Sequence, residues 1–200
     1  MSKKKQEKGK PVNKNTAASK STTGVADLWN EKKPILLFVL GFAVLMGVFY
    51  IFWFSEVFKV NVLEPVVRVN AVVASKVLNI FGFNTQTNGA NLFSSAFTVD
   101  IKYGCDAIEP IAIYTFAVLL FPVSFRTKLS GLFGGVPLLW LLNQLRIISL
   151  FVFGIYSETL FEIMHVQVWQ AVFIAITLIF LAYWIVWALR ADRLKTATSA

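Results

Sequence analysis

Four apolar segments of this chain are each long enough to cross a membrane as a helix. They cover residues 34–54, 108–125, 132–154 and 168–189, of which 108–125 is the shortest. A helix needs about 20 apolar residues to span a hydrocarbon core. Apolar residues also make up 56% of the chain and charged residues only 15%, which argues against a soluble domain. The sequence therefore predicts an all-α integral membrane protein with a four-helix transmembrane bundle.

Basic residues lie where they would orient these spans. The net charge is +8, and lysines crowd the N-terminus among polar residues, which is typical of a disordered tail and not of a nucleic-acid interface. Other basic residues precede the first span, separate the second from the third, and follow the fourth: Lys32, Lys33, Arg126, Lys128, Arg190, Arg193 and Lys195. Basic flanks resist translocation. We therefore expect residues 1–30 to be a disordered basic cytoplasmic tail, 31–190 the transmembrane domain and 191–200 a second cytoplasmic tail.

Residues 57–83 are apolar enough to be mistaken for a fifth span, but their polar residues argue against it. These polar residues recur at helical spacing along one face: Asn61, Glu64, Arg68, Ser75 and Asn79. A fifth span would also place the C-terminal basic residues outside, against the charge rule. We expect an amphipathic helix on the outer membrane surface.

The periodicity then changes. Residues 84–91 are rich in Asn, Thr, Gln and Gly and predict a loop. From 97 to 103, apolar and polar residues alternate, which is typical of a strand with one buried face. This short extracytoplasmic strand leads to Cys105, the one cysteine in the chain, at the outer mouth of the second span.

Cys105 stands just before the predicted start of a helix. Asp106 and Glu109 have the spacing of a capping box, in which side chains accept hydrogen bonds from free backbone amides. Those amides and the helix dipole favour a thiolate, and they could stabilise an oxyanion after the sulfur attacks a carbonyl. Two nearby carboxylates act in the opposite direction and raise the pKa of the thiol. Cys105 is a candidate nucleophile, although a lone cysteine is more often an apolar filler.

Two other reactive groups are predicted on the same side. Arg146 lies inside the third span, where a guanidinium is costly and usually faces a partner; its side chain can snorkel outward. Asn143, one turn earlier, could orient it. His165, the one histidine, lies in the predicted outer link between spans three and four and could exchange a proton with a thiol. A cysteine with an adjacent base is typical of covalent acyl transfer.

Several other chemistries are excluded. One cysteine forbids an intrachain disulfide, and one cysteine with one histidine cannot form a familiar zinc site without carboxylates. The chain has neither a Walker A sequence nor a Gly-rich dinucleotide loop, so we expect no cofactor and no metal. Gly131, Gly134 and Gly135, with Pro137, predict close helix packing or a kink in the third span.

The Cys105 junction, the run from Asn143 to Ile147 and the later His165 together resemble the exosortase/archaeosortase family of membrane-embedded cysteine transpeptidases. The resemblance covers residues 38–189 and is nearest to the short members called exosortase H, which carry a glutamate like Glu109. Many members have a small polar residue and a glycine after the cysteine, whereas this chain has an aspartate and an alanine.

The resemblance implies Cys105 as nucleophile, His165 as general base and acid, and Arg146 as the group that stabilises the thiolate or oxyanion. We add Asn143 and Glu109 as auxiliary residues. The substrates implied are exported proteins whose C-terminal tail combines a short motif, an apolar helix and a basic end. The tail would be cut through a cysteine thioester at the outer face of the bacterial cytoplasmic membrane, and the acyl group would pass to an amine or to water. Membrane lipid is the other expected partner; nucleic acid is not.

A second class of function stays open, namely a non-enzymatic membrane protein such as a small channel, a transporter subunit or an assembly factor. In that case Arg146 pairs with Glu109 to hold the bundle together.

Overall fold

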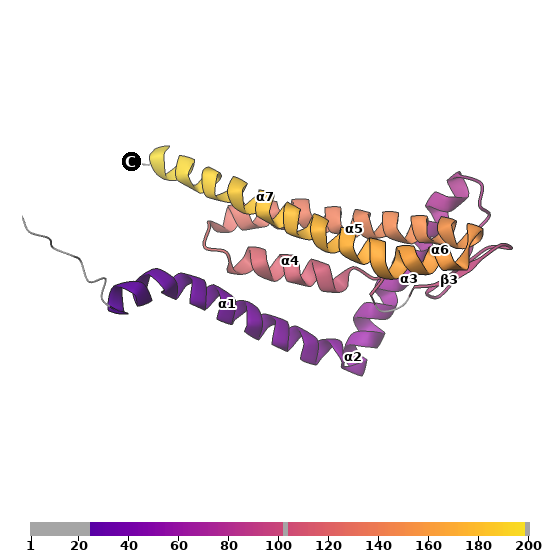
Figure 1. The fold of residues 1–200 in the computed structure, drawn as a ribbon, viewed down its shortest axis with the longest axis horizontal. Helices are drawn as coiled ribbons and strands as arrows, with labels where there is room; N and C mark the ends of the chain where they lie inside the picture. The colour runs from indigo at the N-terminus through magenta and orange to yellow at the C-terminus, as the bar shows by residue number, and fades with distance from the viewer. Residues whose placement is uncertain (1–24, 102–103, 199–200) are drawn as a thin grey trace, which may run out of the picture. The chain divides into compact units, whose positions relative to one another are not determined.

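A computed structural model describes residues 25–101 and 104–198, and the fold is mostly helical (Figure 1). Residues 37–200 form one compact unit, which holds the contacts described below. The elements in chain order, with η marking π-helical turns, are α1 (Val25–Trp53), α2 (Glu56–Phe58), η1 (Lys59–Leu63), α3 (Glu64–Ile80), β1 (Gln86–Asn88), β2 (Asn91–Phe93), β3 (Thr98–Asp100), α4 (Ile108–Leu120), α5 (Phe125–Tyr156), α6 (Glu158–Ile163), η2 (Met164–Val168) and α7 (Trp169–Thr198).

Three helical segments are long and apolar enough to cross a membrane: Lys32–Trp53, Phe125–Tyr156 and Glu158–Arg193. The predicted second span forms α4, which has 13 residues. Such a helix is about 20 Å long at about 1.5 Å per residue, whereas a hydrocarbon core is about 30 Å thick. Three of the four predicted spans are therefore supported by length, and the crossing of α4 stays a prediction.

The predicted N-terminal tail falls largely on residues 1–24, which lie outside the described residues. α1 begins at Val25 and α7 continues to Thr198, so both helices extend into the ranges predicted for the two tails.

Helices α4, α5 and α7 pack side by side (Figure 1), and glycines let α5 approach both neighbours. A Cβ atom on Gly135 would lie 2.2 Å from the Tyr114 ring of α4, and one on Gly131 would lie 2.2 Å from the Trp184 indole of α7. A Cβ on Gly134 would have no atom of another side chain within 4 Å. The predicted close packing is confirmed for Gly131 and Gly135 and is wrong for Gly134.

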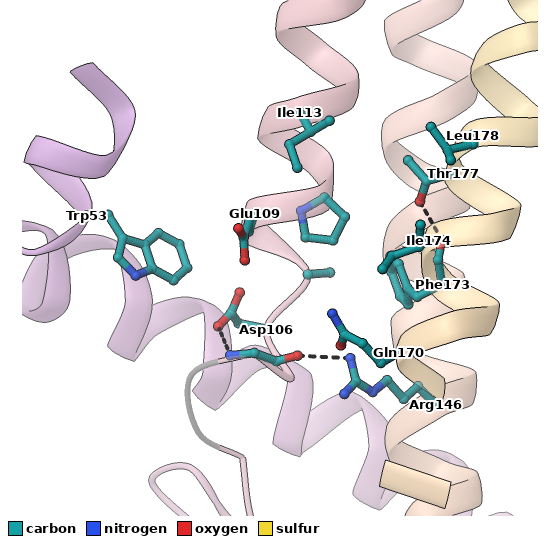
Figure 2. A pocket seen from close by; sticks show the side chains of 13 residues that line it. Trp53, Asp106, Glu109, Ile113, Arg146, Gln170, Phe173, Ile174, Thr177 and Leu178 are labelled. Atoms are coloured by element: carbon teal, nitrogen blue, oxygen red, sulfur yellow. Dashed lines mark hydrogen bonds between the residues drawn. The ribbon is translucent and has the colours of Figure 1, made fainter. Parts of the chain in front are cut away.

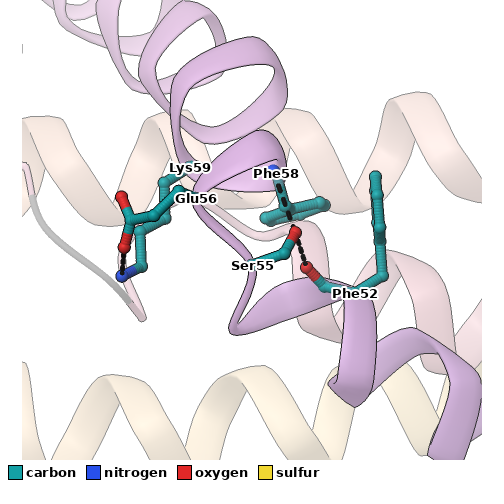
Figure 3. Close-up of polar contacts among 5 residues, drawn as sticks. All are labelled: Phe52, Ser55, Glu56, Phe58 and Lys59. Carbon is teal, nitrogen blue, oxygen red and sulfur yellow. Dashed lines mark hydrogen bonds and ion pairs between the residues drawn. The ribbon is translucent and has the colours of Figure 1, made fainter.

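A serine cap starts the helix that follows α1 (Figure 3). The Ser55 hydroxyl accepts a hydrogen bond from the Phe58 amide at 3.2 Å and donates one to the Phe52 carbonyl at 2.6 Å. Lys59 and Glu56 form an ion pair on the first turn, at 2.6 Å. A serine side chain that accepts an amide at the third helical position stabilises a helix start, so the chain can end α1 and turn within two residues.

The predicted amphipathic helix is present as the continuous helical segment α2, η1 and α3. It buries an apolar stripe that includes Leu63, Val67 and Leu78, and α3 packs against α5 and the strands. The predicted polar face is only partly exposed, because Ser75 is buried and its hydroxyl bonds with Thr85. The position of this helix on the membrane surface stays a prediction.

The three strands form an antiparallel sheet in the order β1-β2-β3. The expected strand is confirmed over Thr98–Asp100, where Val99 pairs with Leu92. The predicted loop at 84–91 was wrong, because Gln86–Asn88 pairs with Asn91–Phe93 as a hairpin. Its turn residue Gly89 has φ +63°, a conformation that glycine adopts without steric cost. The polar composition of these two strands is that of a loop, because Leu92 is the one buried residue within Gln86–Asn88 and Asn91–Phe93.

The chain between α5 and α7 differs from the predicted link. Ser157 separates α5 from α6, and α6, η2 and α7 then run on as one continuous helical segment. His165 therefore lies inside a helix, in the π-helical turn η2, and not in a loop. A π-helical turn inserts an extra residue into a helix and is frequent at functional sites.

Candidate active site

A four-residue loop, 104–107, joins the segment after β3 to α4 and carries Cys105. Cys105 packs in the core formed by α3, the sheet and the end of α5, whereas Ala107 packs in the core between α4, α5 and α7. Gly104 and Ala107 have φ values of +89° and +67°, a left-handed conformation that is costly for alanine. The loop therefore links the two cores through a tight, non-helical backbone.

The Asp106 carboxylate holds this loop in shape. Its two oxygens accept hydrogen bonds from the backbone amides of Gly104, at 3.1 Å, and Ile108, at 2.8 Å. The predicted capping box was wrong: Ala107 occupies the N-cap position, and Glu109 instead accepts a hydrogen bond from the Tyr50 hydroxyl of α1. Asp106 is 2% exposed, and burial raises the pKa of its carboxyl against the opposing effect of the two amides.

The structure brings Cys105 and His165 into contact. Cys105 Sγ lies 3.5 Å from Nδ1 and 4.0 Å from Nε2 of His165. The imidazole stacks on the Phe161 ring one turn earlier, with centroids 5.6 Å apart and planes at 3°. Stacking holds the ring with a nitrogen toward the sulfur, which is the arrangement that a nucleophile and its base require.

Arg146 connects the loop that carries Cys105 to the helical turn that carries His165, through hydrogen bonds to backbone carbonyls. Its Nη1 donates to the Gly104 carbonyl at 2.9 Å, and its Nη2 donates to the His165 carbonyl at 3.5 Å. The side chain is 5% exposed, and its Nε has no hydrogen-bond partner among the residues that the structure describes. Among the described residues, Lys59 pairs with Glu56 and Arg68 pairs with Glu64. No ion pair joins Arg146 to Glu109, both of which are described, so the alternative pairing does not form.

The side chains of Asn143 and Asn70 hold two backbone carbonyls of the 104–107 loop. Asn143, predicted to orient Arg146, instead donates from Nδ2 to the Cys105 carbonyl at 2.9 Å. Asn70 of α3 donates to the Asp106 carbonyl at 3.3 Å, and its Oδ1 accepts from Trp140 at 2.9 Å and Gln144 at 2.8 Å. Asn70 is fully buried, and these bonds give partners to both its amide nitrogen and its amide oxygen.

Sequence reasoning missed Asn70. The available signal was its place on the apolar stripe of α3, between the buried residues Val67 and Ala74. A polar side chain on the buried face of an amphipathic helix must find partners inside the protein.

The surroundings of the Cys105 sulfur favour its neutral form. Burial raises the pKa of the Cys105 thiol, the positive charge of Arg146 lowers it in part, and Asp106 raises it. Desolvation therefore outweighs the attraction of the guanidinium. A thiol in this state needs a base to become nucleophilic, and His165 is the titratable group in contact with it.

A cavity of about 260 Å³ opens beside the loop. It is lined by Trp53 of α1, by loop and α5 residues Gly104, Asp106, Ala107 and Arg146, and by faces of α4 and α7 (Figure 2). The carboxylates of Glu109 and Asp106 lie next to each other there (Figure 2). Neither Cys105 nor His165 lines the cavity, although Gly104 and Asp106, on either side of the cysteine, both do.

The residues described by the structure offer no metal site. No three His, Cys, Asp or Glu side chains within that part of the chain gather closely enough to hold an ion. The predicted absence of a cofactor stays a prediction.

A comparison with protein-family models decides the family. The model of the transmembrane exosortases matches residues 33–183. The chain belongs to this family. The predicted resemblance is therefore confirmed, and the matched part of this exosortase contains Cys105, Arg146 and His165. No curated protein and no solved structure matches the chain.

Family membership and the apolar helices make this exosortase a multi-pass membrane protein. The family also supports a transpeptidase-type role at the membrane.

Proposed function

We propose that this exosortase is a cysteine transpeptidase or protease that removes the C-terminal sorting tail of exported proteins. The observation that carries the proposal is the 3.5 Å contact between Cys105 Sγ and His165 Nδ1. The two residues are on different elements, and both lie beside the buried guanidinium of Arg146. A thiol in contact with a base, with a cation nearby, has the groups that acyl transfer through a thioester requires.

In the first half-reaction, His165 Nδ1 takes the proton of the Cys105 thiol as the sulfur attacks the carbonyl carbon of the scissile peptide bond. The tetrahedral intermediate then collapses, and the imidazolium returns this proton to the leaving amide nitrogen. The products are the released tail, which has a new N-terminus, and a thioester on Cys105. A base that becomes the acid for the leaving group needs no second titratable residue.

In the second half-reaction, an amine or water attacks the thioester carbonyl and His165 accepts the proton of the attacking group. Cys105 leaves as a thiolate and recovers its proton from His165. An amine acceptor gives transfer, and water gives hydrolysis.

Arg146 supports these steps by charge and by position. Its positive charge opposes the pKa-raising effect of burial on Cys105, so it favours the thiolate as that anion forms. Its hydrogen bonds to the Gly104 and His165 carbonyls hold nucleophile and base at one place. Asn143 fixes the Cys105 carbonyl in addition.

The proposed location is the bacterial cytoplasmic membrane, with the site at its outer face and both termini in the cytoplasm. The supporting features are the three long apolar helices and the basic residues beside them. α4 completes the fourth crossing, and the adjoining 104–107 loop lies at its outer end. The helix α3 lies along the outer surface. The partners are exported, tailed proteins and membrane lipid, without nucleic acid.

A processing assay tests the proposal. An exported reporter with an apolar, basic-ended tail is co-expressed with the wild-type chain, with Cys105→Ala and with Cys105→Ser. We expect cleavage by the wild type and none by Cys105→Ala. The wild-type chain should also form a covalent adduct with the reporter through Cys105, and hydroxylamine should release this adduct, as for a thioester. Cleavage that persists in both variants would overturn the enzymatic proposal.

A further inference from the structure

The cavity beside the 104–107 loop is polar at one end and apolar at the other. Its polar end contains Asp106, Glu109 and Arg146, and its apolar end contains Ile113 of α4 and Leu178 of α7 (Figure 2). The polar end therefore adjoins the nucleophile's loop, and the apolar end leads away from it along the apolar helices α4 and α7.

One face of α7 forms the long wall of this cavity. Its lining residues are spaced by three, one, three and one positions, which places them on a single helical stripe: Gln170, Phe173, Ile174, Thr177 and Leu178. Part of this stripe is open, since Ile174 is 52% exposed and Leu178 is 58% exposed. Glu109, Pro110 and Ile113 form the facing wall on α4.

We propose that this groove between α4 and α7 seats the apolar helix of the tailed substrate. The inference rests on the proposed function. A substrate whose scissile carbonyl is at Cys105 must continue, on the tail side, into an apolar helix that enters the membrane. The groove starts at Gly104 and Asp106, which flank Cys105, and it becomes apolar toward Ile113 and Leu178. It therefore follows the path that such a tail requires.

Charge complementarity also identifies a helix as the occupant. A helix that enters the membrane from the outer face has its N-terminal end at the polar end of the groove. That end carries free backbone amides and a partial positive charge. The Glu109 carboxylate lies there, held by the Tyr50 hydroxyl, and Gln170 adds an exposed amide side chain on the opposite wall.

Two adjacent residues of α7 give a matched test. Leu178 lines the groove, whereas Ile179 does not; both are exposed, at 58% and 69%. Leu178→Trp fills the groove, and Ile179→Trp adds the same bulk outside it. At low substrate concentration we expect roughly tenfold slower cleavage of the tailed reporter for Leu178→Trp, equivalent to about 1.4 kcal/mol of lost binding. Cleavage by Ile179→Trp should stay within about twofold, as for a surface change.

Alkylation of Cys105 by a small reagent shows that the fold and the nucleophile survive, and we expect wild-type rates in both variants. Equal rates of cleavage in the two variants, whether both slowed or both unaffected, would overturn the groove proposal. Loss of alkylation in Leu178→Trp alone would also overturn it, because the effect would then come from damage to the loop.

Photo-crosslinking identifies the occupant directly. A photoreactive residue is placed at 178 or at 179 in the Cys105→Ala chain, which retains its substrate uncleaved. We expect adducts with the reporter tail from 178 and not from 179. Adducts from 178 with lipid only, or with a second copy of this chain, would overturn the proposal. Failure of the proposed function is separate, since it appears as a wild-type chain that cleaves no tailed reporter.

Discussion

Cys105 Sγ contacts His165 Nδ1 at 3.5 Å, although 60 positions separate the two residues in the chain. The contact joins a loop before α4 to a π-helical turn before α7. Arg146, on the helix between them, bonds the carbonyl of His165 and that of the residue before Cys105. One buried cation therefore fixes the backbone on both sides of the contact.

Replacing His165 should abolish turnover while the nucleophile stays in place. His165→Asn removes the base but keeps a planar polar side chain in η2. We expect cleavage of a tailed reporter to fall roughly 10²- to 10⁴-fold, the usual contribution of a general acid and base. Single-turnover cleavage measures this. Gln167→Ala, an exposed position in the same turn, is the control and should cleave normally; wild-type cleavage by His165→Asn would remove the histidine from the mechanism.

The alkylation of Cys105 should respond to pH as a buried thiol does. Because burial raises the pKa of this group, the midpoint of the rise in thiolate fraction, and with it in alkylation rate, should lie above the ordinary thiol pKa. Arg146 lowers this pKa in part, so Arg146→Gln should move the midpoint to still higher pH. Rates measured across the alkaline range check both shifts. Arg68→Gln, at an exposed arginine, should leave the midpoint in place; a midpoint below the ordinary value would contradict the assignment.

Asn70 should matter for both stability and the nucleophile's loop. Asn70→Asp keeps an acceptor for Trp140 and Gln144 but loses the donor to the Asp106 carbonyl. We expect a cost of about 1–3 kcal/mol, as for a buried polar group left without its partner, together with slower cleavage. Thermal unfolding in detergent measures the first effect and the reporter assay the second. Asn61→Asp, at an exposed position of the same helical segment, should change neither, and an unaffected Asn70→Asp would show that the loop is held without this residue.

Two neighbouring glycines of α5 should respond oppositely to alanine. In Gly135→Ala the new methyl would lie 2.2 Å from the ring of Tyr114, which is fully buried and bonded to the Gly131 carbonyl at 3.0 Å. The ring cannot move away, so overpacking should cost about 1–3 kcal/mol. Gly134→Ala meets open space and should stabilise α5 by up to about 1 kcal/mol through helix propensity. Thermal unfolding of both variants measures these two effects. Similar unfolding midpoints for Gly135→Ala and Gly134→Ala would contradict the packing described.

Several features could be predicted because they depend on short stretches of sequence. Apolar length predicted α1, α5 and α7, and alternation predicted β3. The amphipathic pattern predicted the helix that contains α3. The hairpin of β1 and β2 was missed because its polar residues carry a loop composition, and its pairing depends on Leu92 reaching the core.

The sequence by itself determined that this is a multi-pass membrane protein of the exosortase family, since apolar length, basic flanks and the residue types at 105, 146 and 165 are local properties. Only the tertiary structure decided that Asp106 folds the loop, that Asn70 and Asn143 hold its carbonyls, and that His165 reaches Cys105 from inside a helix. Backbone carbonyls accept hydrogen bonds in every residue type, so no sequence pattern identifies which of them a distant side chain will bind. Packing of α3, α5 and α7 makes that choice.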